Sequence, residues 1–220
     1  TPLYHKALAK RFGTNEDFPL VFLNIGGVAN ITWIGSNDEL LAFDTGPGCG
    51  LIDDLMFQSF EEPFDKDGNL AATGTVDKAI LKTFLEHPYF KEKPPKSLDR
   101  YTFDPLPIMR LDIPSAIATL TAFTIETVIL GLSVCPAKPR TIIVSGGGRH
   151  NSFLINNLRK RLNISVSYAE SIGLRGDALE AEAFAYLAVR SLHRYSLSLP
   201  ETTGVSRPLT GGRLNQASEK

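Results

Sequence analysis

Short apolar segments separated by tight turns constrain the fold of this chain more than any other feature. Three of them, rich in β-branched and aromatic residues, follow in close succession at 20–24, 29–34 and 40–44. The first turn contains Gly-Gly and the second contains Gly-Ser-Asn-Asp, as is typical between consecutive antiparallel strands. After residues 1–19, the chain is therefore predicted to form three antiparallel strands.

Helices and strands are predicted to alternate in the rest of the chain, because apolar positions recur at helical or strand spacing. These patterns predict helices starting at 51 and spanning 113–132, 152–162 and 177–192, and strands at 141–144 and 164–168. The interval 61–112 is rich in charge and proline, with one amphipathic stretch at 76–85, which indicates an insertion of helix and loop. The predicted class is α/β, with a mixed five-stranded sheet and helices on both faces.

Composition restricts the partners and the compartment. Lys plus Arg (23) nearly balances Asp plus Glu (24), and no basic run with interleaved aromatics is present, so nucleic acid is not an expected partner. Cys49 and Cys135 have neither disulfide-framework nor zinc-site spacing, which favours a reducing cytoplasm. Neither a signal peptide nor 18 uninterrupted apolar residues is found, so no membrane is expected. Because Thr1 is not a translational start, the chain is expected to be processed or part of a longer protein.

The first glycine-rich segment joins the first two predicted strands. In Asn24-Ile25-Gly26-Gly27, backbone N–H groups can approach an anion without a Cβ in the way, as in phosphate-binding loops. Asn24, Gly26 and Gly27 are therefore candidate nucleotide-binding residues. Gly-Gly is also a favoured hairpin dipeptide, so an ordinary turn remains the alternative.

The second segment, Phe43-Asp44-Thr45-Gly46-Pro47-Gly48, follows the third predicted strand. A carboxylate at the carboxyl end of a strand, before a glycine-rich turn into a helix, is well placed to act as a general base. Asp44 is the candidate base, and Thr45, Gly46, Pro47 and Gly48 are candidate substrate-binding residues. The alternative is an aspartate that accepts local backbone hydrogen bonds in a turn.

Two further segments follow the predicted strand at 141–144. Gly146, Gly147 and Gly148 lead from this strand into a helix, where close approach of a nucleotide is possible, although such turns also serve packing alone. Further on, Asp177 and Glu180 have the spacing of a capping box, while Glu180 is also a candidate substrate-binding residue. The four histidines show no ligand spacing and are expected to be surface or capping groups.

Taken together, these motifs resemble those of anhydro-N-acetylmuramic acid kinases, in their order and context. The segments are NIGGVANIT, FDTGPG, LIDDLM, DKDGNLAATGTVD, HPYF with PPKSLDR, ATLTAFT, VSGGGRHN, ALEAEAFAYLA and SLPETTGVSRPLTGGRL. The resemblance covers nearly the whole chain. It implies the ribonuclease-H-like second lobe of the actin, sugar-kinase and Hsp70 fold group, which agrees with the predicted order of elements.

The resemblance also implies an activity. The family cleaves the 1,6-anhydro bridge of its sugar and phosphorylates the freed O6, using ATP and magnesium, in the recycling of bacterial peptidoglycan. Asp44 would be the general base on the attacking water, Asn24 to Gly27 the phosphate-contacting hairpin, and Gly146 to Gly148 the adenosine-contacting turn. No residue of the chain is assigned to the metal.

Two departures from the family pattern stand out. Cys49 replaces the usual Asn after Gly-Pro-Gly, and a thiol is a weaker hydrogen-bonding group than an amide. The family's first lobe, with its phosphate- and magnesium-contacting loop, has no counterpart before Leu20, while 1–19 resembles the segment that joins the lobes. The chain is therefore expected to be the second lobe, 20–220, and to be inactive alone. The missing first lobe is an expected partner, and a homodimer is left open.

Two other readings remain. One is a non-catalytic, one-lobed relic that binds nucleotide or sugar, or only forms dimers. The other is a different sugar kinase or chaperone-like ATPase of the same fold group. The second is disfavoured because PPKSLDR and DKDGNLAATG lie in the insertion, where other families should diverge.

Overall fold

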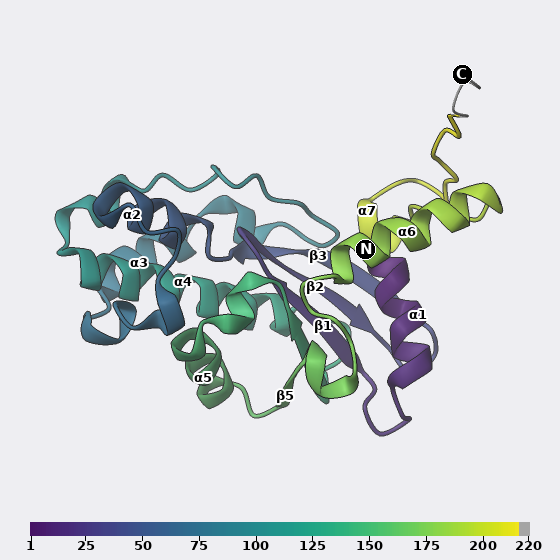
Figure 1. Ribbon diagram of the computed structural model, residues 1–220, viewed down its shortest axis with the longest axis horizontal. Helices are drawn as coiled ribbons and strands as arrows, with labels where there is room; N and C mark the ends of the chain where they lie inside the picture. Colours follow the sequence, from purple (N-terminus) through teal and green to yellow (C-terminus); the bar gives the residue numbers. More distant parts are fainter. Residues whose placement is uncertain (216–220) are drawn as a thin grey trace, which may run out of the picture.

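A five-stranded mixed sheet forms the centre of the computed structural model, which describes residues 1–215 (Figure 1). The strands are β1 (Leu20–Ile25), β2 (Val28–Ile34), β3 (Leu40–Pro47), β4 (Thr141–Ser145) and β5 (Ser165–Tyr168). Their order is β3-β2-β1-β4-β5, with β1, β2 and β3 antiparallel in succession and β4 parallel to both β1 and β5. This arrangement confirms the predicted ribonuclease-H-like α/β class.

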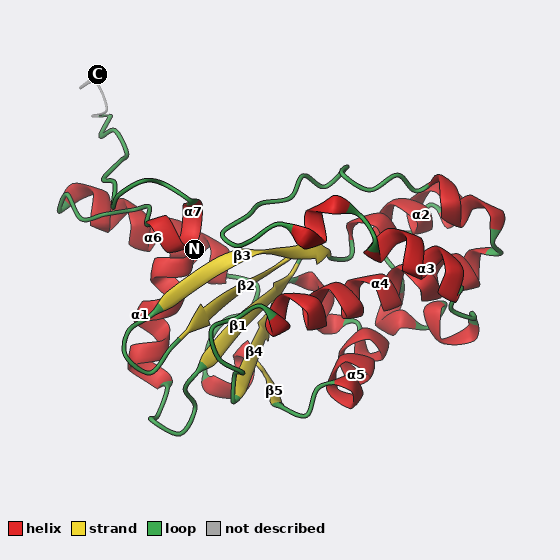
Figure 2. Ribbon diagram, turned by 180° about the vertical axis from the view of Figure 1, so that it is seen from behind, coloured by secondary structure: helices red, strands yellow, loops and turns green. Residues whose placement is uncertain are grey.

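Helices cover both faces of the sheet (Figure 2). The α-helices are α1 (Pro2–Phe12), α2 (Gly50–Phe60), α3 (Lys78–Leu85), α4 (Ile113–Ser133), α5 (Ser152–Arg161), α6 (Leu179–Leu192) and α7 (Pro200–Thr203). Side chains alternate across β1, so Leu20 and Phe22 pack with α1 and α6, while Val21 and Leu23 pack with α4 and α5. Both faces of β1 are buried, which explains its continuous apolar character.

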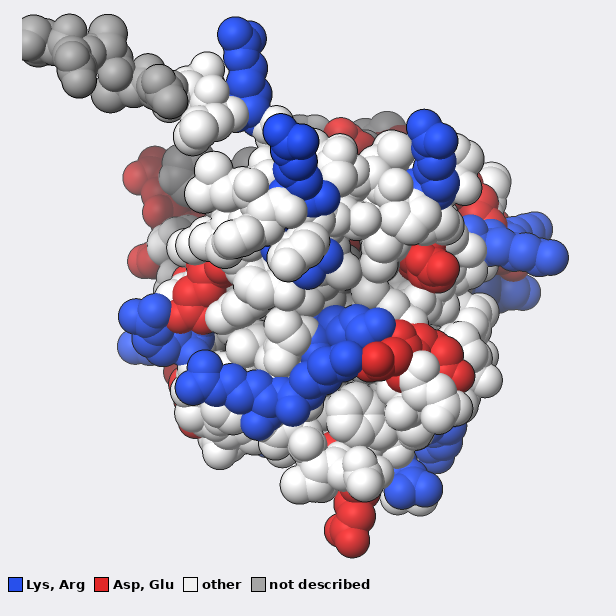
Figure 3. Space-filling model, turned by 90° about the vertical axis from the view of Figure 1, so that its right-hand side faces the viewer, with Lys and Arg blue, Asp and Glu red and all other residues white. Residues whose placement is uncertain are grey.

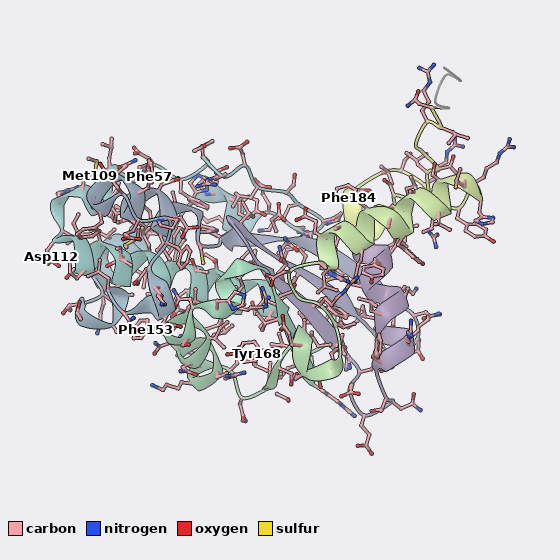
Figure 4. The ribbon with its side chains drawn as sticks, in the orientation of Figure 1. Phe57, Met109, Asp112, Phe153, Tyr168 and Phe184 are labelled. Carbon is pink, nitrogen blue, oxygen red and sulfur yellow. The ribbon has the colours of Figure 1, made fainter. Side chains whose placement is uncertain are left out.

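Helix α4 is the most apolar helix of the fold. By length and composition it is apolar enough to cross a membrane, but 72% of its most apolar window is buried inside the protein. Asp112 caps its N-terminus, where the carboxylate accepts a hydrogen bond from the amide of Ser115 (Figure 4). Since its neighbours are the sheet on one side and α2 and α3 on the other, α4 is a core helix.

The interval 61–112 leaves the sheet and packs with α2 and α4 around a separate apolar cluster. It contains α3, which confirms the amphipathic stretch predicted at 76–85, and several short 3-10 turns. The 3-10 turns within residues 1–215 are η1 (Lys66–Gly68), η2 (Ala71–Thr73), η3 (Pro88–Lys91), η4 (Leu106–Arg110), η5 (Gly147–His150) and η6 (Ala169–Ile172). Phe123 stacks on Phe84 and meets Phe103 edge to face at the centre of this cluster.

Two predicted boundaries are wrong. Strand β3 does not stop at Asp44 but continues through Thr45, Gly46 and Pro47, because Gly46 and Pro47 still pair with β2 across a bulge. Helix α6 begins at Leu179 rather than at Asp177, because the carboxylate of Asp177 bonds to an arginine elsewhere instead of capping the helix.

The surface carries both signs of charge and a few exposed apolar side chains. Lys and Arg are interspersed with Asp and Glu on the end of the molecule seen in Figure 3. Phe57 on α2 and Met109 in the insertion lie near each other at one end of the molecule, and Phe184 lies on α6 towards the other end (Figure 4).

Candidate functional site

A row of polar side chains crosses four strands at the edge of the sheet where β1, β3 and β4 end. Asn24 on β1 pairs with Ser145 on β4 and with Asn30 on β2, and Asn30 pairs with Asp44 on β3. All four lie on the face covered by α1 and α6, because each is an even number of positions along its strand from an apolar residue that packs there, namely Phe22, Ile143, Ile34 or Leu40. Since ligands of open α/β sheets bind at the carboxyl ends of strands, this row marks the candidate site.

The first two glycine-rich segments form one bonded unit beside this row. The amide of Cys49 donates to the carbonyl of Gly26 at 2.7 Å, and the amides of Gly48 and Gly50 donate to the carbonyl of Gly27 at 3.0 and 3.2 Å. The carbonyls of the Gly-Gly hairpin therefore accept hydrogen bonds from the backbone amides at the start of α2. A Cβ on Gly26 or Gly27 would meet nothing closer than 3.7 Å, so both keep an open side.

In the third glycine-rich segment, two glycines are required by close packing and one faces open space. Gly146 has a φ of +79°, and a Cβ on it or on Gly148 would collide with β1. A Cβ on Gly147, by contrast, would meet nothing within 4 Å. Packing alone therefore explains Gly146 and Gly148, whereas Gly147 leaves room for a ligand.

Arg149 fixes the position of this third turn. Its side chain is only 3% exposed and donates to the carbonyl of Gly146 at 2.9 Å. It also pairs with Glu170 and Asp177, each at 2.9 Å, which lowers the pKa of the Asp177 carboxyl. Asp177 was predicted to form a capping box with Glu180. Instead, it connects the start of α6 to the glycine turn.

A first cavity of about 500 Å³ opens between the glycine turns and the insertion. Its walls combine apolar groups with carboxylates, a lysine and a histidine. The lining residues are Gly26, Gly27, Cys49, Ile52, Asp53, Phe64, Asp65, Lys66, Asp67, Gly147, Gly148, His150 and Asn151. Apolar walls with a few polar groups are typical of small-molecule sites.

A second cavity, of about 290 Å³, lies over Asn24, Asn30 and Ser145 of the polar row, while Asp44 is not among the lining residues of either cavity. It shares Gly26 and Gly147 with the first. It is lined by Thr1, His5, Asn24, Gly26, Asn30, Ser145, Gly146, Gly147, Gly176, Asp177, Leu179 and Glu180. The structure thus brings Glu180, at the start of α6, together with Asn24 and Gly146. Amide, hydroxyl and carboxylate groups predominate, as suits a ligand rich in hydrogen-bonding groups.

Asp44 lies half-buried at the end of the polar row. Its Oδ2 accepts a hydrogen bond of 2.7 Å from the amide of Leu98, in the insertion. Burial raises the pKa of the Asp44 carboxyl, and the bond from Leu98 partly opposes this change. A carboxylate with a raised pKa is a stronger base than an exposed aspartate.

The residues after Asp44 face the interior. Thr45 is buried and donates to the carbonyl of Ala29 at 3.1 Å, while Gly46 lies so close to Thr127 of α4 that a Cβ would collide with it. Pro47 and Gly48 are buried as well. Substrate binding by Thr45, Gly46, Pro47 and Gly48 stays a prediction, and the contacts seen here are with the protein itself.

Asp53 was not predicted from the sequence to be a site residue, although it lies in the LIDDLM segment of α2. It lines the first cavity, and burial, together with neighbouring Asp54, raises the pKa of its carboxyl to about 6 against the opposing effect of Arg100. Cys49, at the start of the same helix, makes no side-chain cap bond, and burial raises the pKa of its thiol to about 12. An asparagine there would be a better cap than this protonated thiol.

His5 was predicted to be a surface or capping group, and this prediction is wrong. The ring is 2% exposed, stacks on Phe22 with centroids 4.5 Å apart, and places Nδ1 2.9 Å from the hydroxyl of Thr32. Burial lowers the pKa of His5 to about 3, so the ring is neutral at pH 7. The ring also lines the second cavity, which only the packing of α1 on the sheet reveals. His87 does cap η3, and His150 and His193 are exposed, as expected.

Within residues 1–215, no group of three or more His, Cys, Asp or Glu side chains is arranged to hold a metal ion. The described residues therefore do not form a magnesium cage by themselves.

Comparison with known proteins places these features in a family. Residues 1–217 match the family model described as anhydro-N-acetylmuramic acid kinase. Proteins of that name from Rhizorhabdus wittichii and Caulobacter vibrioides are 51% and 49% identical to the chain, over 96% and 97% of its length. The chain spans 57% of the length of each of these curated relatives.

The solved structures that match the chain are much more distant in sequence. A ligand-bound xylulose kinase from Lactobacillus acidophilus is 15% identical, with a TM-score of 0.48 over 84% of this chain and 41% of that one. The family therefore rests on the sequence match over nearly the whole chain and on its high identity to the curated relatives: the chain belongs to the anhydro-N-acetylmuramic acid kinase family.

Proposed function

We propose that this chain is the second lobe of an ATP-dependent kinase that hydrolyses the 1,6-anhydro bridge of anhydro-N-acetylmuramic acid and phosphorylates O6, in peptidoglycan recycling. The observation that carries this proposal is the position of Asp44 on the polar row, in a chain that belongs to a family of that name. Residues 20–220 would form the lobe, and residues 1–19 would join it to a first lobe. The shorter span of the chain relative to its relatives supports this division.

The two cavities suggest where the substrates bind. We assign the nucleotide to the first cavity, where Ile52 and Phe64 offer apolar walls for a base. Because both cavities include Gly26 and Gly147, a phosphate chain at these glycines would lead from the nucleotide towards the second cavity. The sugar would then lie over the polar row. In-line phosphoryl transfer requires donor and acceptor to meet in this way.

Asp44 would act as the general base. With Oδ2 held by the amide of Leu98, Oδ1 is the oxygen that would take a proton from water attacking the anomeric carbon. A bond forms between the water oxygen and the anomeric carbon as the bond to the bridge oxygen breaks. The departing O6 then attacks the γ-phosphate, and ADP leaves. The raised pKa of Asp44 favours the proton transfer.

The remaining partners follow from the family. Magnesium would neutralise phosphate charge, and the missing first lobe would supply contacts that residues 1–215 lack. A homodimer remains compatible with this lobe. Two half-buried free cysteines fit a reducing compartment, so we assign the enzyme to the cytoplasm.

The test measures ADP release with ATP, magnesium and 1,6-anhydro-N-acetylmuramic acid. It compares the 220-residue chain with a longer chain in which the first lobe of the Rhizorhabdus wittichii relative precedes it. We expect turnover only in the longer chain, and loss of turnover in its Asp44→Asn variant. Glu16→Gln, an exposed carboxylate that lines neither cavity, is the matched control and should keep full turnover.

Two results would contradict the proposal. Full turnover in the folded Asp44→Asn variant would remove Asp44 as the base. An inactive longer chain that folds and binds ATP would favour the one-lobed relic, in which the lobe binds nucleotide or sugar without chemistry.

A further inference from the structure

One segment of the insertion, residues 94–100, crosses the end of β3 and contacts Asp44. The amide of Asp44 donates to the carbonyl of Lys96 at 3.1 Å, and the amide of Leu98 donates to Oδ2 of Asp44 at 2.7 Å. The hydroxyl of Tyr89, shortly before this segment, donates to the carbonyl of Asp44 at 2.5 Å. The amide, the carbonyl and the carboxylate of Asp44 are therefore all bonded to the insertion.

These contacts support one another. Tyr89 is buried, and burial raises the pKa of its hydroxyl, which stays protonated and able to donate. Lys96 donates to the carbonyl of Tyr89 at 2.7 Å, and its ammonium lies 4.1 Å from the centroid of the Tyr89 ring. Because Lys96 bonds both Tyr89 and the amide of Asp44, the crossing segment cannot move without disturbing the whole set.

The other end of the segment is held near the glycine turns. Arg100 pairs with Asp54 of α2 at 2.6 Å and donates to the carbonyl of Gly50 at 3.4 Å. The side chain of Arg100 lies beside Gly27. The segment therefore runs from the carboxylate of Asp44 to the start of α2, and both ends are fixed.

We propose that residues 94–100 are a positioning strap for Asp44, in which the Leu98 amide holds Oδ2 and Tyr89 with Lys96 holds the strap in place. The proposal rests on the proposed role of Asp44 as the base. It gives the PPKSLDR motif a function that its sequence alone does not reveal. The strap stops rotation of the carboxylate, so that Oδ1 alone is presented to the reacting water.

The bonds to residue 44 differ in whether they need its side chain. This difference distinguishes positioning of the carboxylate from support of the fold. Two of the three bonds involve the backbone of residue 44 and would form with any side chain there. The bond from Leu98 requires a side-chain acceptor, which only the carboxylate of Asp44, or an amide in its place, provides. Support of β3 alone would not need this third bond.

The first experiment follows the Leu98 amide by NMR in the 220-residue chain, without catalysis. We expect the Leu98 amide proton to shift downfield as Asp44 ionises, with the same midpoint as the Asp44 carboxyl carbon. In Asp44→Asn this pH-dependent shift should vanish while the strap stays folded. A Leu98 amide that does not follow the ionisation of Asp44 in the wild-type chain would overturn the proposal.

The second experiment measures kinetics in the longer two-lobed chain. Tyr89→Phe and Lys96→Met should each lower kcat by about 10- to 100-fold with little change in KM, because the base is misplaced while substrate binding is retained. Tyr101→Phe, whose ring is exposed just beyond the strap, is the matched control and should keep wild-type kcat. Unchanged kcat in both strap variants, with the chain folded, would also overturn the proposal. An inactive wild-type longer chain would count against the proposed function only, since the NMR result stands without it.

Discussion

The imidazole of His5 is buried, with Nδ1 2.9 Å from the hydroxyl of Thr32. This contact attaches α1 to the middle of β2, two residues along the strand from Asn30 of the polar row. Because Nδ1 is occupied and the ring lines the second cavity, Nε2 is the nitrogen left to meet a ligand. A residue at the start of the chain thereby becomes part of the candidate site.

Burial of His5 should make stability depend on pH. The pKa is about 3 in the folded chain against 6.5 for an ordinary histidine, so only the unfolded state takes up the proton between these values. Stability should fall as pH decreases below 6.5. Between pH 7 and pH 5 the His5 contribution amounts to about 2 kcal/mol of unfolding free energy. Urea unfolding of wild type and His5→Gln measures it as the difference between their pH slopes, and equal slopes would contradict the burial.

Asp53 should change stability with pH in the direction opposite to that of His5. Its folded pKa of about 6 exceeds the ordinary 3.8, so the folded state holds the proton more tightly and loses stability as pH rises through this window. Asp53→Asn should therefore be more stable than wild type at pH 7.5, by about 1 kcal/mol or less because the group is only half-buried. The difference should disappear near pH 4. Thermal unfolding at both pH values tests this, and a destabilised variant at pH 7.5 would contradict it.

The glycines should separate into those required by packing and those open to a ligand. A Cβ on Gly48 would collide with the carbonyl of Gly26, so Gly48→Ala should destabilise the chain by about 1–3 kcal/mol. Gly147→Ala meets nothing within 4 Å and should change stability by less than about 0.5 kcal/mol. It should nevertheless weaken ATP binding, because the added methyl enters both cavities. Urea unfolding and calorimetric titration with ATP distinguish the two, and unaffected ATP binding in Gly147→Ala would move the nucleotide elsewhere.

Arg149 should contribute more to stability than an exposed ion pair does. Arg149→Met removes the bonds to Gly146, Glu170 and Asp177 and should cost about 1–3 kcal/mol. The control is Lys82→Met, whose 78% exposed side chain lies 3.9 Å from Glu86 and should cost under about 0.5 kcal/mol. Chemical denaturation compares them, and equal losses would show that the buried arginine has no special role.

Much of the fold could be predicted because the signals are local. The continuous apolar run of β1, the Gly-Gly turn before β2 and the helical spacing of α5 each depend on neighbours within a few residues. The predicted strands and helices were therefore close to those observed. The glycine segments lie together at one edge of the sheet, because β1, β3 and β4 all end there.

What the sequence determined by itself was the order of the elements, the α/β class and the family resemblance, since all three are carried by local patterns and motifs. Only the tertiary structure decided which side chains meet. Asp44 bonds to Leu98, 54 positions away, and His5 bonds to Thr32, 27 positions away. Asp177 bonds to Arg149 instead of capping its own helix. Such contacts depend on how whole helices pack on the sheet. Burial, and the need for every enclosed polar group to form hydrogen bonds, then outweigh local preferences.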